Sequence, residues 1–188
     1  MLINPADRRL VLVSGPPAAG KTTIASPLAA ELGFSLLAKD RIKEALHDAL
    51  GQEIDLAWSR RLGAASMELL WVLAADAPSV VLEANFWPDD PRHQARLLDL
   101  GTTPVEVHCL CPIDECMRRY SERGSARHAV HVDSHQLRMT AEEFEKSARP
   151  LGLGPVIAVD TTRPVDIRAL ASEIRQQLRA QVSVPSAG

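Results

Sequence analysis

The chain is poor in cysteine, and its cysteines are badly placed for cross-linking. Three of the 188 residues are cysteine, and Cys109, Cys111 and Cys116 all lie within a stretch of eight positions. An odd set this compact argues against a disulfide framework and favours buried, reduced thiols. A metal site that includes the adjacent His108 is the weaker alternative, because no second cysteine or histidine pair follows at zinc spacing.

Long apolar runs and an excess of basic residues are also missing. The most apolar stretch, Leu69–Leu82, is interrupted by Asp76 and Pro78 and is far shorter than a membrane span. The first nine residues lack the apolar core of a signal peptide, so we expect a cytoplasmic protein without membrane contact. The formal net charge of −3 argues against a protein devoted to duplex nucleic acid. The segment from Arg118 to Arg138 is locally basic, with five arginines and three histidines against two acidic residues.

What the chain does have is a regular alternation of two patterns. Short apolar runs typical of strands alternate with segments of helical periodicity, which predicts an α/β fold around a five-stranded parallel sheet. The expected strands are 10–14, 35–38, 79–84, 105–111 and 156–160, and the expected helices are 23–32, 41–50, 56–75, 91–100, 113–123, 141–148 and 165–180. The apolar runs 80–82 and 156–159 predict strands covered on both faces. The length suits a single domain over residues 1–181, with 182–188 as a flexible tail.

Helix boundaries are signalled by two kinds of residue. Gly33, Gly51 and Gly101 fall where three helices are expected to stop. Thr140 begins the sequence Thr-Ala-Glu-Glu, which has the form of a capping box and predicts a helix start.

Residues 15–22 form a complete G-x-x-x-x-G-K-[ST] phosphate-binding motif, placed between an expected strand and an expected helix as its chemistry requires. Its glycines allow successive N–H groups to point at phosphate oxygens, and the helix N-terminus adds its positive dipole end. We expect Lys21 to reach the β- and γ-phosphates of a nucleoside triphosphate, and the Thr22 hydroxyl to ligate Mg²⁺. The alternative is a simple turn. The expected nucleotide contacts are Gly15, Pro16, Pro17, Ala18, Ala19, Gly20, Lys21, Thr22 and Thr23.

Ligands of open α/β sheets bind beyond the carboxyl ends of the strands. We therefore expect one cleft to collect the dispersed candidates, namely 15–22, Asp40, 83–87, 123–135 and 160–164. Asp40 follows the second expected strand, where a carboxylate is well placed to orient and deprotonate an attacking hydroxyl. Alternatively, Asp40 serves as the N-cap of the next helix, a position that aspartate favours.

Four motifs, taken in order, resemble the small P-loop kinases. They are the loop at 15–22, the segment Lys39-Asp40-x-x-Lys43, a strand that ends in Glu83-Ala84-Asn85, and the later arginine-rich segment. The chain looks most like the AAA_33 group, which includes zeta-toxin-like, chloramphenicol-phosphotransferase-like and polynucleotide-kinase-like proteins. The resemblance implies a nucleoside-kinase-like P-loop NTPase sandwich of three layers, a short lid at about 123–138, and the use of ATP and Mg²⁺.

The resemblance also implies a role for each matching residue. An aspartate at the place of Asp40 activates the acceptor hydroxyl, and a basic residue three places later, here Lys43, contacts the acceptor. Arginine is commoner there in polynucleotide kinases, so a lysine weakens the case for a nucleic-acid acceptor. Glu83 stands in the Walker B-like place, where aspartate is more usual, and would hold Mg²⁺ through a bound water. Alternatively, Glu83 is an exposed residue at a strand end.

Arginines after the fourth expected strand form the expected lid. Arg119 and Arg123 share a helical face, and Arg127 follows. In the resembling kinases such a lid neutralises charge on the transferring phosphoryl group, the role expected of Arg123 and Arg127, with Arg119 as a nucleotide contact. A solvated basic helix is the alternative. The resemblance further places three residues beside the adenine: Thr161, Thr162 and Arg163.

Candidates for the acceptor side are less specific. Asn85, Phe86 and Trp87 are expected at the cleft mouth, where they form part of an acceptor wall. The segment 46–71 is expected to choose the acceptor, through Glu53, Asp55, Trp58 and Trp71. For His128, His131, His135 and Asp133, lid or acceptor contacts are preferred to a metal site.

These observations predict an ATP- and Mg²⁺-dependent kinase that phosphorylates a hydroxyl of a small molecule, such as an antibiotic, a sugar, a nucleoside or a sugar nucleotide. One alternative is a kinase for the 5′-hydroxyl of RNA or DNA. The other is a regulatory or binding module that hydrolyses ATP slowly. The residue types carry no information about the oligomeric state.

Overall fold

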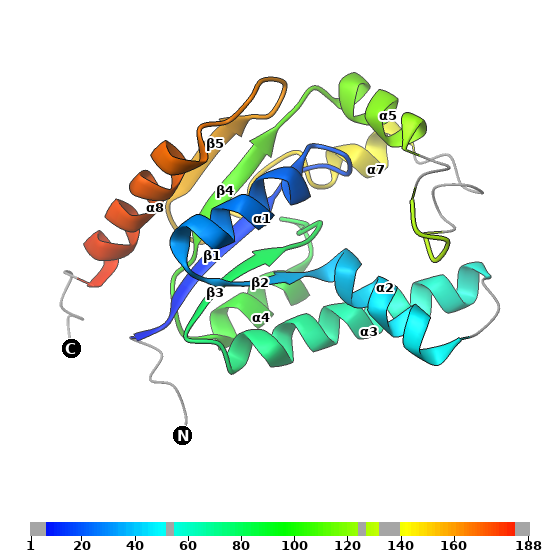
Figure 1. The fold of residues 1–188 in the computed structure, drawn as a ribbon, viewed down its shortest axis with the longest axis horizontal. Coiled ribbons are helices and arrows are strands. Elements are labelled where there is room, and N and C mark those ends of the chain that lie inside the picture. Colours follow the sequence, from blue (N-terminus) through cyan, green and yellow to red (C-terminus); the bar gives the residue numbers. More distant parts are fainter. Residues whose placement is uncertain (1–6, 52–54, 124–126, 132–139, 183–188) are drawn as a thin grey trace.

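The computed structural model describes residues 7–51, 55–123, 127–131 and 140–182 (Figure 1). Most of the expected lid, residues 124–126 and 132–139, lies outside the described residues, as does the expected tail from residue 183 onward. Three candidates named above also lie outside the described residues: Asp133 and His135 within 132–139, and Glu53 within 52–54.

Five parallel strands form the central sheet, as the alternating pattern predicts. Their order is β2-β3-β1-β4-β5, with every neighbouring pair parallel. Each strand lies within one residue of its expected bounds. The strands are β1 (Arg9–Ser14), β2 (Ser35–Ala38), β3 (Ser79–Glu83), β4 (Val105–Leu110) and β5 (Val156–Asp160).

Seven helices of the described part of the chain surround this sheet, close to the ranges expected from helical periodicity. They are α1 (Lys21–Leu32), α2 (Lys39–Leu50), α3 (Leu56–Ala75), α4 (Pro91–Asp99), α5 (Ile113–Glu122), α7 (Ala141–Glu145) and α8 (Ile167–Val182). The expected boundary signals are confirmed at three places. Gly33 and Gly51 end α1 and α2 in the left-handed conformation, and Thr140 and Glu143 form the capping box of α7.

Alternation of side chains along β1 divides the core between the two faces of the sheet. Val11 and Val13 pack with apolar residues of α1 and α8, whereas Leu10 and Leu12 pack with those of α3 and α4. Helices therefore cover both faces, which gives the expected three layers (Figure 1). Parallel strands buried in this way place all their carboxyl ends at one edge of the sheet.

The expectation that β5 is covered on both faces is wrong. Ile157 and Val159 are buried against the α1 and α8 side, but Val156 and Ala158 on the other face are exposed. The reason is the strand order, which makes β5 an edge strand next to β4. An apolar run alone does not report whether a second helix layer reaches the edge.

Candidate active site

The phosphate-binding motif forms a tight loop between β1 and α1. Gly15 has a φ of +131°, and a Cβ built there would lie 2.7 Å from the carbonyl oxygen of Cys109. Gly20, with a φ of +86°, is the N-cap of α1, so Lys21 and Thr22 already belong to the first turn of the helix. The helix thus starts two residues earlier than its expected range, and its free N–H groups face the loop.

Lys21 lies buried at the base of this loop. Its Nζ donates to the carbonyl oxygens of Gly15 at 2.9 Å and Pro16 at 2.7 Å. Burial lowers the pKa of the Lys21 ammonium, and the nearby carboxylate of Glu83 opposes that change. A buried ammonium held by two carbonyl oxygens is a fixed positive charge beside the place where phosphates would bind.

Glu83 ends β3 beside the first turn of α1. Its Oε1 accepts a hydrogen bond of 3.2 Å from the Thr22 hydroxyl, so the alternative of an exposed strand-end glutamate is wrong. Burial raises the pKa of the Glu83 carboxyl, while Lys21 lowers it. A hydroxyl and a carboxylate oxygen at this separation are hard oxygen donors of the kind that Mg²⁺ prefers, so the residues fit that ion.

Asp40 lies in the first turn of α2, across the cleft from the loop. Ala38 is the N-cap of α2, and the Asp40 side chain makes no capping bond, so the N-cap alternative is wrong. Its carboxylate forms ion pairs of 3.3 Å with Lys39 and 3.2 Å with Arg127. Burial favours the neutral carboxyl, but nearby positive charge, from Lys39 first and also from Arg127 and Lys21, outweighs it and lowers the pKa of Asp40 to about 2. Asp40 is therefore ionised at neutral pH.

One cleft at the carboxyl ends of the strands collects most of the predicted site residues, as expected. Its lining includes Pro17, Ala18, Gly20, Lys21, Thr22, Asp40, Lys43, Glu83, Asn85, Arg123 and Arg127. Gly15, Pro16 and Ala19 are buried within the loop. The lining also includes His131, which was expected to make lid or acceptor contacts, and Lys39 and Tyr120, which were not named as site residues. The Tyr120 ring lies 5.5 Å from the Arg127 guanidinium carbon, a contact that only the folded chain reveals.

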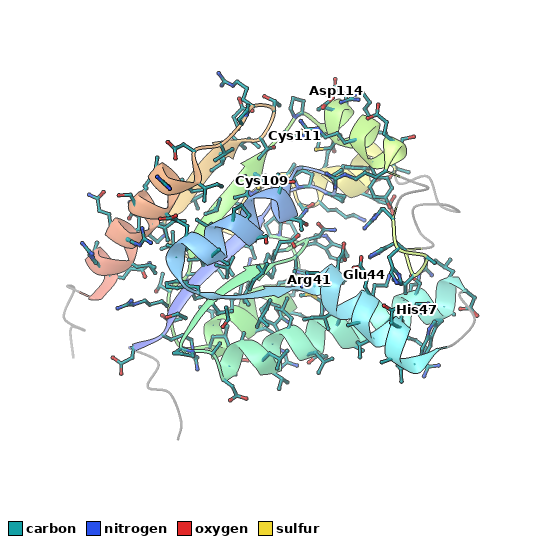
Figure 2. The ribbon with its side chains drawn as sticks, in the orientation of Figure 1. Arg41, Glu44, His47, Cys109, Cys111 and Asp114 are labelled. Atoms are coloured by element: carbon teal, nitrogen blue, oxygen red, sulfur yellow. The ribbon has the colours of Figure 1, made fainter. Side chains whose placement is uncertain are left out.

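A row of acidic residues on α2 holds the segment 127–131 against the cleft. His131 Nε2 lies 2.8 Å from Glu44, and His128 Nε2 lies 3.0 Å from Asp48. Together with the pair of Arg127 and Asp40, these contacts use carboxylates spaced four residues apart, on one face of α2. Figure 2 labels Glu44 on this helix, beside the 127–131 segment.

Lys43 lines the cleft but is almost fully buried. Its Nζ donates to the Ser59 hydroxyl at 2.7 Å, and that hydroxyl donates to the carbonyl oxygen of Val130 at 2.7 Å. This chain of bonds connects α2, α3 and the 127–131 segment. Acceptor binding by Lys43 stays a prediction, and Ser59, which sequence reasoning missed, is the residue through which the lysine is anchored.

The predicted adenine side lies next to the cleft. Arg119 donates to the carbonyl oxygen of Thr161 at 3.3 Å, and a neighbouring cavity is lined by residues that include Gly20, Thr23, Arg119, Arg123, Thr161 and Arg163. Thr162 is exposed, and its hydroxyl donates to Asp160 at 2.6 Å. The position of these residues beside the phosphate-binding loop agrees with nucleotide contacts. The contact of each residue with a nucleotide stays a prediction.

The expected acceptor wall is only partly present. Phe86 is wrong as a wall residue, because it is buried in the core against Trp71 at a ring distance of 5.9 Å. Asn85 lines the cleft, and Trp87, which is 41% exposed, lines an adjoining groove. Asp55 caps α3 by accepting from the backbone N–H of Trp58, whose ring contacts Arg61. Among the described residues, neither Asp55 nor Trp58 belongs to the lining of the cleft or of the adjoining groove.

Behind the loop lies a buried polar cluster that the sequence analysis missed. Glu106, on β4, is fully buried and accepts from the Ser14 hydroxyl at 2.5 Å and from the backbone N–H groups of Leu151 at 3.0 Å and Gly152 at 2.9 Å. His108 lies 2.8 Å from the same hydroxyl and 3.0 Å from the carbonyl oxygen of Ala148. A signal for this cluster was available in the sequence. Glu106 and His108 alternate with apolar residues along an expected strand, on a face that was expected to be covered.

The cysteines are free, as predicted. Cys109 and Cys116 are buried, and Cys111 is half-buried. Figure 2 shows Cys109 and Cys111 at the carboxyl end of β4. Burial raises the pKa of the Cys109 and Cys116 thiols to about 12. Among the residues described, no cluster of three or more His, Cys, Asp or Glu side chains is arranged to hold a metal ion.

The fold and the loop define a P-loop nucleotide-binding protein of the small-kinase class. The model of the AAA_33 family, an AAA domain, matches residues 10–147, and the chain belongs to this family. A candidate kinase from Chloroflexus aurantiacus has a solved structure that is 32% identical, with a TM-score of 0.76 over 91% of this chain and 98% of that chain.

More distant structures share the fold alone. The APS kinase CysC of Mycobacterium tuberculosis, solved with AMPPNP and APS, is 22% identical, with a TM-score of 0.55 over 92% of this chain and 99% of that chain. A shikimate kinase from Acinetobacter baumannii, in complex with shikimate, is 18% identical, with a TM-score of 0.51 over 92% and 94% of the two chains.

Curated proteins give a shorter match. The replication factor C large subunit of Thermococcus kodakarensis is 26% identical over 102 residues, which are 54% of this chain and 19% of that protein. The chain thus spans about a fifth of the length of the curated relatives that it matches. Across the described ranges, none of the helices combines the length and the apolar character that a membrane crossing needs.

Proposed function

We propose that this protein is an ATP- and Mg²⁺-dependent phosphotransferase that moves the γ-phosphoryl group to a hydroxyl of a small molecule. The observation that carries the proposal is the cleft in which the Asp40 carboxylate faces the loop residues Lys21 and Thr22. Such a cleft can hold a phosphoryl donor at one wall and a hydroxyl acceptor at the other.

Each residue of the cleft has a role in the proposed reaction. The loop N–H groups and the Lys21 ammonium bind the β- and γ-phosphates. Thr22 and Glu83 would hold Mg²⁺, which supplies charge neutralisation at the phosphates when bound. Arg123 and Arg127 are placed to neutralise charge on the transferring group, since both line the cleft.

Asp40 is proposed as the residue that orients the acceptor hydroxyl and receives its proton. A pKa of about 2 makes Asp40 a weak base, so alignment of the hydroxyl contributes more than early proton removal. This suits phosphoryl transfer, where the attacking oxygen gains little bonding before the leaving oxygen departs.

The test is the substitution Asp40→Asn, measured with an acceptor found by screening hydroxyl compounds for ATP consumption. We expect turnover to fall by a factor of about 10²–10⁴, while the affinity for a non-hydrolysable ATP analogue changes by less than about threefold. Asp76→Asn is the matched control, because Asp76 is exposed at the end of α3 and does not line the cleft. Wild-type turnover by Asp40→Asn would refute the assignment.

The alternative of a nucleic-acid acceptor gains little support from the described part of the basic segment. Arg118 pairs with Glu115 and Glu122 at 2.7 and 2.6 Å, and Arg127 pairs with Asp40 at 3.2 Å. Charges compensated in this way leave little field to attract a phosphate backbone. A 5′-hydroxyl oligonucleotide belongs in the acceptor screen, where we expect no phosphorylation.

A further inference from the structure

A groove of about 790 Å³ adjoins the candidate active site. It lies between α3, α4 and the segment that follows β3, and it shares Lys39 and Asn85 with the cleft that contains Asp40. The two spaces therefore adjoin at these two residues. A volume of this size suits one small organic molecule and is far too small for a polymer.

Aromatic rings form one wall of the groove. The His93 ring lies 5.8 Å from the Trp87 ring and 6.4 Å from the Trp71 ring. The Trp87 backbone N–H donates to His93 Nδ1 at 3.0 Å, so the imidazole carries its own proton on Nε2. Burial lowers the pKa of His93, although the charge of Asp90 opposes this, and the ring is neutral at pH 7. The Trp71 and Trp87 rings are tilted by 52° and 50° to the His93 ring, so the wall is a faceted aromatic surface, uncharged and equipped with one N–H donor.

Small residues of α3 shape the opposite side. Gly63 lies inside the helix, and a Cβ built there would meet the Lys39 ammonium at 3.8 Å. Glycine is disfavoured inside helices, so its presence here leaves room that a larger side chain would fill. Ala64 and Met67 continue the same low-polarity lining.

Charges around the groove cancel one another. The lining has three cations, Lys39, Arg92 and Arg96, and three carboxylates, Glu68, Asp90 and Asp99. Arg92 pairs with Asp90 at 2.7 Å at the start of α4. Arg96 of α4 pairs with Glu68 of α3 at 2.5 Å. A rim balanced in this way offers no net attraction to an anion or a cation, and favours an uncharged ligand.

We propose that this groove binds the acceptor, and that the acceptor is an uncharged aromatic alcohol. Its ring stacks on Trp87 and meets the tilted His93 ring at an angle, and its hydroxyl lies at the end marked by Lys39 and Asn85, toward Asp40. The proposal rests on the phosphotransferase function above and narrows its acceptor class. It excludes carboxylated and phosphorylated acceptors and simple polyols.

The reaction at this site balances with ATP as the donor. The acceptor oxygen forms a bond to the γ-phosphorus as the bond from that phosphorus to the β,γ-bridging oxygen breaks, which releases ADP. The hydroxyl proton passes to Asp40 and from there to solvent. The products are the phosphate monoester of the alcohol, ADP and one proton.

The experiment uses matched probes on the full chain. The panel pairs 3-phenyl-1,2-propanediol and other neutral aromatic alcohols with glycerol, which lacks the ring, and with 3-phenyllactate, which carries a carboxylate. Binding is measured by calorimetry, and phosphoryl transfer by mass spectrometry of the product. We expect saturable binding of at least one aromatic alcohol, with glycerol and 3-phenyllactate at least tenfold weaker.

Variants then locate the binding. Trp87→Ala is expected to weaken binding of the aromatic alcohol at least tenfold, whereas Trp87→Phe should keep most of the affinity. Gly63→Val is expected to prevent binding because its side chain fills the groove. Trp58→Phe is the matched control, because Trp58 lies outside the groove lining. Circular dichroism confirms that each variant is folded, and the 41% exposure of Trp87 makes its replacement mild.

The outcomes separate this proposal from the one on which it rests. Three results would overturn the groove as the acceptor site. They are aromatic-alcohol binding that is as strong in Trp87→Ala and Gly63→Val as in wild type, tighter binding of glycerol or 3-phenyllactate, and no binding of any aromatic alcohol. Transfer to another acceptor would then still support the kinase. Groove-dependent binding without any phosphorylated product refutes the phosphotransferase and leaves the binding site standing.

Discussion

Replacing Glu106 by leucine removes the acceptor of three hydrogen bonds behind the phosphate-binding loop. Glu106 is fully buried, and its oxygens hold the Ser14 hydroxyl and the backbone N–H groups of Leu151 and Gly152. Leucine has a similar volume, so the substitution tests the polar contacts more than the packing. We expect the fold to be retained with a lower free energy of unfolding.

The size of the loss follows from which donors are left without a partner. Ser14 retains His108 at 2.8 Å, and Gly152 is exposed, so its N–H can turn to water. The N–H of the buried Leu151 has neither a second hydrogen-bond partner among the described residues nor access to water. One buried orphan costs about 1–3 kcal/mol, and each hydrogen bond that is lost adds about 0.5–1.5 kcal/mol. The expected cost is about 3 kcal/mol, a large share of the roughly 5–15 kcal/mol that stabilises a domain.

Urea unfolding followed by circular dichroism measures this cost. Glu106→Gln keeps one acceptor oxygen and should cost less than Glu106→Leu, whereas Glu173→Leu on the exposed side of α8 should stay within about 0.5 kcal/mol of wild type. A cost below about 1 kcal/mol for Glu106→Leu would show that the cluster does not hold the loop 151–152 in place, and the reasoning would be wrong.

Three further predictions concern titration and metal dependence. Because burial raises the pKa of Cys109 and Cys116 to about 12, both thiols should resist Ellman's reagent at pH 8 until urea unfolds the chain; rapid labelling of either in the native protein would contradict their burial. Cations hold the pKa of Asp40 at about 2, below its ordinary 3.8, so its ionised form stabilises the fold above pH 4 and this contribution is lost toward pH 2. The difference in urea midpoint between wild type and Asp40→Asn should therefore shrink over that interval, and a constant difference would argue against the ion pairs. Thr22→Val should abolish the Mg²⁺-dependent part of ATP affinity measured by calorimetry, whereas Thr23→Val should retain it; equal behaviour of the two variants would remove Thr22 as a ligand.

The features that lie within short segments could be predicted from the residues alone. The phosphate-binding loop is such a feature, because its glycines, its lysine and the helix that follows are consecutive in the chain. The strand and helix bounds follow from local periodicity, and the capping box at Thr140 needs only four residues. The convergence of Asp40 and Glu83 on the loop also followed, because parallel strands end at one edge.

What the tertiary structure decided depends on contacts between distant residues. Ser59, which accepts from Lys43, reaches the carbonyl oxygen of Val130 across 71 positions of the chain, and no local pattern encodes that partner. The strand order left one face of β5 without a helix, although its apolar run resembles that of a buried strand. Phe86 turned into the core while its neighbour Trp87 turned outward.

The sequence by itself therefore determined the fold class and the donor half of the site, because both arise from consecutive residues with strong local preferences. The groove that we propose as the acceptor half was decided only by tertiary structure. The groove exists because α3, α4 and the segment after β3 bring Trp71, Trp87 and His93 together. Its charge balance depends in part on the ion pair between Arg96 of α4 and Glu68 of α3, which spans two helices. Such pairs form only once the sheet order has set which helices are neighbours.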